Sequence, residues 1–492
     1  MLDKIKRLGS DTAIYGISTI LGRFLTFLLT PLYTHVLSAE DLGVVATAYA
    51  YIAFLNVIYA YGMEGAYMKY VSTLELGDRK QVFTVPFLSV ALTSIAFSGL
   101  LAAFAGSVAG VSGIPPDFES IVFMGAGILL LDALTIIPFA SLRMASRAKA
   151  FAAIKIAGIV VNVVCNVVFL FAFRMGVQGI FLSGLISSAI TLVLLLPVLL
   201  RSLVFSWPEK ILPALLRFGL PTVPAGIAGM MLQVINRPIL GALKGDAAVG
   251  VFQANYRLGI FMMLLVSMFD FAWRPFFLNH AQDPDARPLF ARVMTYFVLA
   301  ATTVFLLLSF FLFDLISWPV FGGYPLIAAR FWEGFEIIPV ILLAYVFLGI
   351  YNNLIAGIYI EKKTSWLPLV TITAAVIHVA ANFLLIPPFG LMGAAWSTLL
   401  SYVVMAGMMY VIVQRVYPVV YEIPRLVKIA LTAASVFLAS LFVGSGVFGL
   451  FAKAGLLLLF FALLGGTRFF EPREYEAARR LLRRAGFVRS SG

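Results

Sequence analysis

Apolar stretches of about 20 residues recur from one end of the chain to the other, separated by short polar segments. A run of this length crosses the hydrocarbon core of a bilayer as a single helix. The pattern predicts an all-α integral membrane protein with about fourteen transmembrane helices. We expect these helices at residues 12–34, 43–64, 82–106, 119–141, 152–172, 177–200, 218–240, 249–272, 291–318, 335–359, 365–386, 391–413, 427–445 and 450–467.

Composition supports this interpretation. The 492 residues are 62% hydrophobic and 12% charged, with a mean hydropathy of +1.01, which excludes an ordinary soluble globular protein. Basic residues precede the first apolar stretch, but no small-residue cleavage site follows it, so we expect residues 12–34 to remain as the first helix. The single cysteine, Cys165, excludes an internal disulfide.

The net charge of +12 is distributed unevenly between the two membrane faces. With a cytoplasmic N-terminus, most of the 35 Lys and Arg residues, Lys155 among them, fall in cytoplasmic segments. Those on the opposite face are Arg174, Lys244, Arg330 and Lys453. This asymmetry predicts a multi-pass plasma (inner) membrane protein with both termini cytoplasmic, and it argues against a nucleic-acid partner. The arginines that belong to neither face are Arg23, Arg237 and Arg257.

The chain contains an internal repeat. A shift of 207 residues places Gly22, Pro31, Gly43 and Tyr49 on Gly229, Pro238, Gly250 and Tyr256 without a gap. A looser similarity joins residues 162–179 to residues 378–395. Since six crossings return the chain to the same side, the two lobes are expected to be a parallel repeat about an axis along the membrane normal. The predicted parts are an N-lobe (1–204, helices 1–6), a cytoplasmic linker (205–217), a C-lobe (218–416, helices 7–12), helices 13–14 (417–467) and a basic cytoplasmic tail (468–492).

Polar side chains form a stripe along the first predicted helix. At 100° per residue, one arc holds Thr12, Tyr15, Thr19, Arg23, Thr26, Thr30, Tyr33 and Thr34. Helix 7 repeats this pattern in the same register, and polar residues share a face of helix 8. A helix surrounded by lipid gains nothing from such a stripe, so we expect a water-filled cavity between the lobes. The predicted lining residues are Tyr15, Thr19, Thr26, Thr30, Tyr49, Gln233, Asn236, Gln253 and Tyr256.

Three arginines inside membrane helices predict a site for an anion. The guanidinium grips phosphate oxygens bidentately and stays ionised, so Arg23, Arg237 and Arg257 suit a diphosphate. Structural roles are the alternatives: Arg23 pairing with Asp132, and Arg237 reaching the headgroup level. Candidates for coupling to H+ or Na+ are Asp132, Asp270 and Asp314. The sequence has no cluster with metal-ligand spacing and no nucleophile constellation, so we expect neither an enzyme nor a bound cofactor.

Three stretches resemble the polysaccharide transporter family. They are YGISTILGRFLTFLLTPLYTHVLSAEDLGVVATAYAYIAFLNVIYAYGMEGAYMKYV, RFGLPTVPAGIAGMMLQVINRPILG and NFLLIPPFGLMGAAWSTLLSY. This family contains flippases of lipid-linked oligosaccharides and is related to lipid II flippases and multidrug exporters. The resemblance implies that helices 1, 2, 7 and 8 line the cavity and that its arginines meet a lipid-linked pyrophosphate. It also implies that helices 13–14 hold the polyprenyl tail.

The expected function is therefore a flippase that moves a polyprenyl (undecaprenyl-type) pyrophosphate-linked oligosaccharide to the outer leaflet by alternating access, for cell-surface polysaccharide biosynthesis. Expected partners are that glycan lipid, membrane lipids and other polysaccharide-assembly proteins. Three alternatives remain: a drug or organic-cation antiporter, a lipid II flippase and a membrane glycan polymerase or ligase. The first calls for acidic cavity residues, and the last for a large outer loop with catalytic groups.

Overall fold

The computed structural model describes residue 16 and residues 20–204, 206–321, 323–444 and 446–471. Within these ranges the structure is helical apart from loops and one short antiparallel pair of strands, β1 (Pro319–Phe321) and β2 (Tyr324–Pro325). Twelve helices in the described part of the chain are long and apolar enough to cross a membrane. The prediction of an all-α, multi-pass membrane protein is confirmed.

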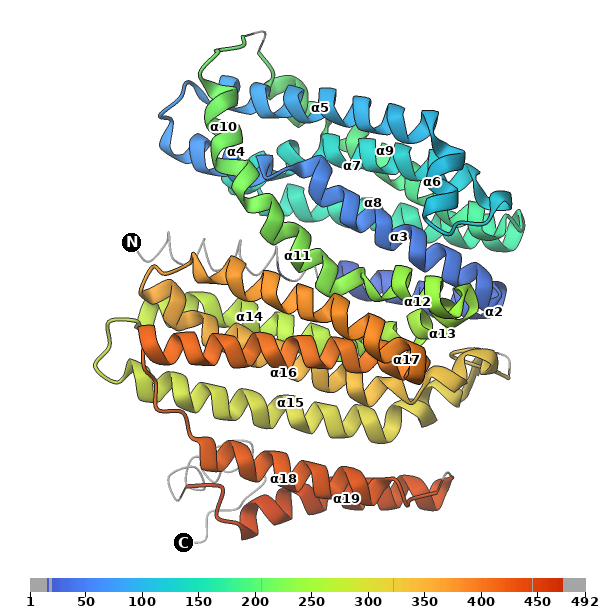
Figure 1. Ribbon diagram of the computed structural model, residues 1–492, viewed down its shortest axis with the longest axis vertical. Coiled ribbons are helices and arrows are strands. Elements are labelled where there is room, and N and C mark those ends of the chain that lie inside the picture. The colour runs from blue at the N-terminus through green and yellow to red at the C-terminus, as the bar shows by residue number, and fades with distance from the viewer. Residues whose placement is uncertain (1–15, 17–19, 205, 322, 445, 472–492) are drawn as a thin grey trace, which may run out of the picture.

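The first bundle contains the helices that precede residue 203 (Figure 1). Its elements are α2 (Leu29–Val36), α3 (Ala39–Ala60), α4 (Met63–Thr73), α5 (Arg79–Ala103), α6 (Ala105–Val111), η1 (Pro116–Phe118), α7 (Ser120–Met144), α8 (Ala148–Val167), the π-helical η2 (Val168–Ala172) and α9 (Gly176–Ser202). The first predicted helix lies partly outside the described residues; residues 20–27 of it are helical and lead into α2.

Capping boxes fix where two of these helices begin. Ser38 Oγ accepts from the Asp41 N–H at 3.0 Å, and the Asp41 carboxylate accepts from the Ser38 N–H at 3.4 Å. Asp78 and Gln81 make the same reciprocal pair at the start of α5. The cap at Ser38 explains why α3 begins at Ala39, four residues before the apolar run that predicted it.

The second bundle begins with a broken helix. Residues 211–217, which the sequence placed in the linker, form α10 because Ile211 and Leu215 are buried on its apolar face. The elements of this part are α10 (Ile211–Gly219), η3 (Leu220–Thr222), α11 (Val223–Val234), α12 (Asn236–Lys244), α13 (Asp246–Tyr256), η4 (Arg257–Gly259), α14 (Ile260–His280), α15 (Ala286–Ser317), η5 (Ala329–Gly334), α16 (Ile337–Ile360) and α17 (Trp366–Val416).

The helix α17 contains two membrane crossings. Its 51 residues would span about 76 Å at 1.5 Å per residue, more than twice the hydrocarbon thickness. Gly390 has φ 55° and ψ −127° and follows Pro387 and Pro388, so the chain reverses there. With this reversal and the partly described first helix, the structure agrees with the fourteen predicted crossings.

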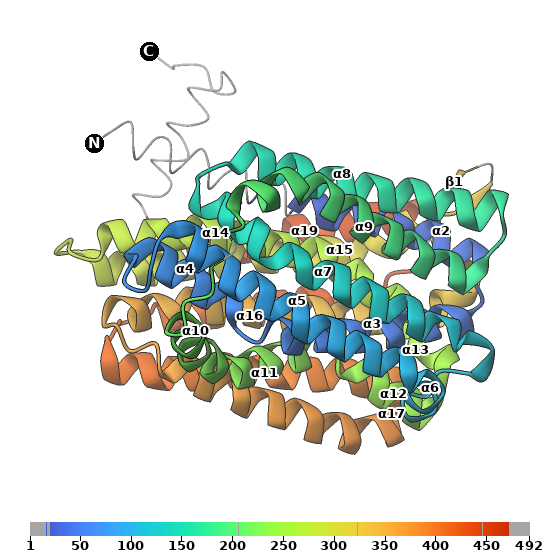
Figure 2. The same cartoon turned by 90° about the horizontal axis from the view of Figure 1, so that it is seen from above.

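The helices of the two bundles run roughly parallel to one another (Figures 1 and 2). In Figure 1 the bundles lie one above the other, and α11 runs between them. Helix α3 of the first bundle packs against α13, α11 and α12. The last two helices, α18 (Ile423–Ser440) and α19 (Val447–Gly466), form a hairpin that packs against α15 on the far side of the second bundle. The space between the bundles is where the sequence predicts the site.

Candidate functional site

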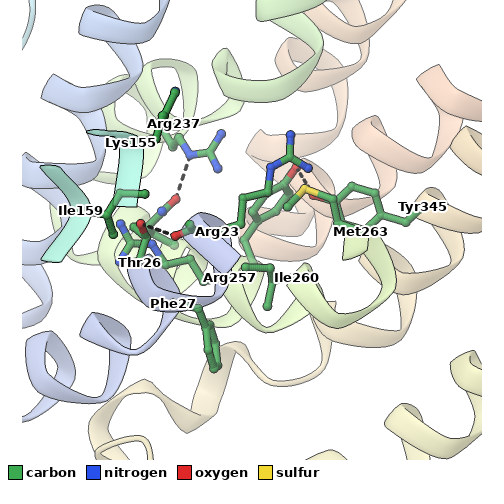
Figure 3. Close-up of a pocket in the computed structure, with 13 residues that line it drawn as sticks. Arg23, Thr26, Phe27, Lys155, Ile159, Arg237, Arg257, Ile260, Met263 and Tyr345 are labelled. Atoms are coloured by element: carbon green, nitrogen blue, oxygen red, sulfur yellow. Dashed lines mark hydrogen bonds between the residues drawn. The ribbon is translucent and has the colours of Figure 1, made fainter. Parts of the chain in front are cut away.

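A cavity of about 440 Å³ lies between the two bundles (Figure 3). Its walls come from the helical segment 20–27, α8, α12, α13, η4, α14 and α16. The lining residues are Gly22, Arg23, Thr26, Phe27, Lys155, Ile159, Arg237, Gln253, Tyr256, Arg257, Ile260, Met263 and Tyr345. The three arginines that the sequence singled out therefore meet in one place, although they are up to 234 positions apart.

Arg237 is held firmly in this wall. Its side chain is only 7% exposed, and its Nε donates to Gln253 Oε1 at 2.8 Å. A second bond runs from Nη1 to the carbonyl oxygen of Gln233, and the guanidinium lies 4.7 Å from the centre of the Tyr256 ring. Tyr256 in turn accepts from Tyr345 Oη at 3.1 Å. These contacts hold the guanidinium of Arg237 inside the protein, in the wall of the cavity.

Arg257 differs from Arg23 and Arg237 in the hydrogen bonding of its guanidinium. Its Nη1 is buried and has no hydrogen-bond partner in the described part of the chain, and the guanidinium lies 5.6 Å from the centre of the Tyr33 ring. Tyr33 is itself fixed by a 2.8 Å bond from its hydroxyl to Asn166 Oδ1. An ionised donor buried without a partner is costly, which is why such groups concentrate at binding sites.

Arg23 faces the cavity and is exposed to it. Its Nη1 donates to Ser267 Oγ of α14 at 3.0 Å, which links the first helix to the second bundle. The alternative partner, Asp132, instead accepts from Ser188 Oγ at 2.7 Å. Arg23 is thus hydrogen-bonded to a neutral hydroxyl, and no carboxylate of the described residues forms an ion pair with it.

Lys155 is a fourth cation in the cavity wall, which the sequence interpretation did not include among the site residues. It was assigned to a cytoplasmic segment, but it lies two turns inside α8, which begins at Ala148. Its ammonium is 5.7 Å from the centre of the Phe139 ring, and the Asp132 carboxylate attracts it electrostatically. A lysine two turns into an apolar helix, with an acid on the preceding helix, is the signal that could have revealed it.

The other predicted lining residues fall into three groups. Thr26, Gln253 and Tyr256 line the cavity, and Tyr49 lines a smaller neighbouring cavity. Away from both cavities, Thr30 is buried in α2, Gln233 bonds to the carbonyl of Gly229, and Asn236 donates to Thr398 Oγ1. Tyr15 and Thr19 lie outside the described residues.

None of the three candidate coupling carboxylates is among the residues that line the described cavities. Asp132 is bonded to Ser188 behind Lys155. Asp270 pairs with Arg274 one turn later in α14, at 3.2 Å. Asp314 of α15 pairs with Lys453 of α19 at 2.6 Å. Among the residues that the structure describes, the cavity wall therefore carries four positive side chains and no carboxylate.

The fold matches solved transporters across most of its length. The inward closed conformation of the lipid II flippase MurJ aligns with a TM-score of 0.74 and 13% identity, covering 92% of this chain and 98% of its own. An inward-facing multidrug resistance MATE family transporter of the MOP superfamily aligns with a TM-score of 0.64 and 15% identity, covering 80% of this chain and 94% of its own. The MATE multidrug transporter DinF-BH aligns with a TM-score of 0.62 and 17% identity, covering 83% of this chain and 95% of its own.

These neighbours bear the names of flippases and transporters rather than enzymes, in agreement with the sequence-based expectation. At such identities they show that the chain has the fold of the MOP superfamily. No curated protein sequence matches the chain. A family described as polysaccharide biosynthesis protein matches residues 33–286, which is more than half of the chain. The chain is therefore a member of this polysaccharide biosynthesis protein family, folded as a MOP-superfamily membrane transporter.

Proposed function

We propose that the protein is a flippase for a polyprenyl-pyrophosphate-linked oligosaccharide, which it moves from the cytoplasmic to the outer leaflet. The observation that carries this proposal is the cavity wall, in which the described residues of both bundles contribute four cations and no carboxylate. A diphosphate headgroup supplies the negative charge that these side chains need. The family membership adds polysaccharide biosynthesis as the setting.

The site chemistry fits a sugar diphosphate. Arg23, Arg237 and Arg257 offer guanidinium N–H donors for phosphate oxygens, and Lys155 adds a point charge. Gln253 and Tyr256 supply hydrogen bonds and an aromatic face of the kind that sugars use. Phe27 and Ile260 complete the wall with apolar surface.

Transport outward needs no coupling ion in this proposal. With both termini cytoplasmic, a headgroup of about two negative charges moves downhill in an inside-negative potential, by about 2.3 kcal/mol per charge per 100 mV. The polyprenyl tail stays in lipid while the headgroup crosses. The hairpin of α18 and α19, which exposes large apolar side chains such as Phe448 and Phe451, is a suitable surface for that tail.

The alternatives differ in the headgroup that they need. An organic-cation antiporter is disfavoured because a cation would meet four positive charges in the cavity. A lipid II flippase would use the same diphosphate chemistry, and the sugar attached to it distinguishes the two. A polymerase or ligase would need catalytic groups that the wall of the cavity does not offer.

Native mass spectrometry of the purified protein tests the proposal. Binding of a polyprenyl diphosphate, a polyprenyl monophosphate and a cationic dye is compared for the wild type and for Arg23→Gln, Arg237→Gln and Arg257→Gln. The control is Arg274→Gln, which removes an exposed arginine outside the cavity.

We expect diphosphate to bind in preference to the other two ligands, and each cavity variant to lose this preference while the control keeps it. Equal diphosphate binding in all proteins would make the arginines structural and overturn the proposal. A preference for the dye would instead support the function of an organic-cation antiporter.

A further inference from the structure

A second, smaller cavity of about 150 Å³ shares three polar residues with the large one. Arg237, Gln253 and Arg257 line both cavities, so their side chains stand between them. The remaining wall is apolar except for Tyr49 and consists of Leu42, Val45, Ala46, Ala50 and Val234. At about 30 Å³ per water molecule, this volume holds several waters or one phosphoryl group.

The small cavity lies beside a very close helix crossing. Leu42, Val45 and Ala46 belong to the first turns of α3, next to Gly43. A Cβ atom on Gly43 would lie 1.9 Å from the carbonyl oxygen of Asp246 in α13. A Cβ atom on Gly250 would lie 1.9 Å from the carbonyl oxygen of Ala39. Because backbone cannot yield at that distance, only glycine permits this crossing.

The crossing obeys the internal repeat. Gly43 and Gly250 are 207 positions apart, and so are their contact partners Ala39 and Asp246. Gly43 meets Asp246, and its equivalent in the repeat, Gly250, meets Ala39, which is the equivalent of Asp246. The interface is therefore self-complementary, like the interface of a twofold dimer. Movement of the two bundles away from each other at this end would separate α3 from α13 at this contact.

A further contact joins the bundles at the same end. Arg330 of η5 donates from Nη2 to the carbonyl oxygens of Thr34 at 2.8 Å and Leu37 at 2.5 Å. These carbonyls end α2, immediately before α3. Helices α2 and α12 lie at the same end of the molecule (Figure 1). At this end the glycine crossing and the Arg330 contact both join the two bundles.

We propose that the small cavity is the release-side half of the headgroup site, binds a phosphate-type anion, and is sealed by the Gly43–Gly250 crossing. This inference rests on the proposed function. Arg237 and Arg257 serve both halves: they face the large cavity while the crossing is closed and deliver the anion to the small one when it opens. The buried, unpartnered Nη1 of Arg257 is the donor available for that second contact.

Cysteine accessibility tests the seal. In a Cys165→Ser background, Ala46→Cys places a thiol in the wall of the small cavity. A membrane-impermeant anionic thiol reagent is added to the α12 face of sealed, oriented vesicles. We expect slow labelling with both glycines intact and labelling about tenfold faster with Gly250→Ala or Gly43→Ala, because the added methyl opposes closure; tenfold corresponds to about 1.4 kcal/mol.

Gly229→Ala is the matched control, since a Cβ there meets nothing within 4 Å. It adds the same methyl group to a helix of the interface without touching the other bundle. The two glycine variants lie in different bundles, so the same effect from both is attributable to their shared contact. Labelling as slow in both as in Gly229→Ala would overturn the seal.

Inorganic pyrophosphate tests the anion half of the inference. We expect millimolar pyrophosphate to slow the labelling of Ala46→Cys in the Gly250→Ala protein several-fold, and equimolar chloride not to do so. A second variant, Ala46→Leu with intact glycines, fills the small cavity and should weaken pyrophosphate binding several-fold, whereas Ala53→Leu, outside both cavities, should not.

Absence of both pyrophosphate effects would overturn the anion subsite even if the seal holds. Failure of the proposed function gives a different result. In that case the seal and pyrophosphate protection persist, but the polyprenyl diphosphate of the binding experiment above shows no preference over the monophosphate.

Discussion

Replacing Arg257 by methionine should separate function from stability. The change removes the charge and keeps a flexible apolar side chain of similar length. Among the described residues, the Arg257 guanidinium contacts the ring of Tyr33 at 5.6 Å, and its Nη1 is buried without a hydrogen-bond partner. We therefore expect weaker pyrophosphate binding without a loss of stability.

The magnitudes follow from these contacts. A hydrogen bond to a charged group contributes about 1.5–3 kcal/mol, so the dissociation constant for pyrophosphate should rise about 10- to 150-fold. Loss of the contact with Tyr33 lowers the free energy of unfolding by about 1–2 kcal/mol. Burial of the unpaired charge costs the wild type several kcal/mol of stability, and the variant avoids this cost. The melting temperature should stay the same or rise.

Arg237→Met is the matched comparison. It leaves the buried Gln253 Oε1 without its donor, at a cost of about 1–3 kcal/mol, so this variant should lose both affinity and stability. Titration calorimetry with inorganic pyrophosphate and thermal unfolding in detergent measure the two quantities. The reasoning is refuted if Arg257→Met unfolds several degrees earlier and binds pyrophosphate as the wild type does.

Three further changes are predicted in the same assays. Lys155→Met should raise the pyrophosphate dissociation constant about tenfold, because a cation leaves the cavity wall; an unchanged constant would remove Lys155 from the site. Asp314→Asn should lower stability by about 1–3 kcal/mol, because Lys453 loses its partner, and should leave pyrophosphate affinity intact; reduced affinity would contradict the geometry. Gly390→Ala should cost about 1–3 kcal/mol of stability, because alanine disfavours φ 55° and ψ −127°; a variant as stable as the wild type would argue against this reversal.

The pattern of apolar runs predicted the helices well. Each membrane crossing must form the hydrogen bonds of its own backbone and present apolar side chains to lipid. The repeat also carried information beyond the helix count, since Gly43 and Gly250 proved to be symmetric contacts. Helix boundaries were less predictable. The cap at Ser38 and the reversal at Gly390 depend on side-chain and backbone geometry that hydropathy does not contain.

The cationic site was predictable in part. Arg23 stood out from the periodicity of its helix, whereas Lys155 was assigned to the membrane surface because it follows a basic connecting segment. The partners of the carboxylates were harder to predict. Arg274 could have been found one turn after Asp270, but the pairing of Asp314 with Lys453 joins positions 139 residues apart and needs the packed fold.

The most direct test of the central claim is translocation in proteoliposomes. A polyprenyl-diphosphate disaccharide with a fluorescent sugar is placed in both leaflets, and an impermeant quencher is added outside. We expect the wild type and Asp314→Asn to make the inner-leaflet lipid accessible, and the combined variant of Arg23, Lys155, Arg237 and Arg257 to glutamine to leave it protected. Translocation by that combined variant at the wild-type rate would contradict the account.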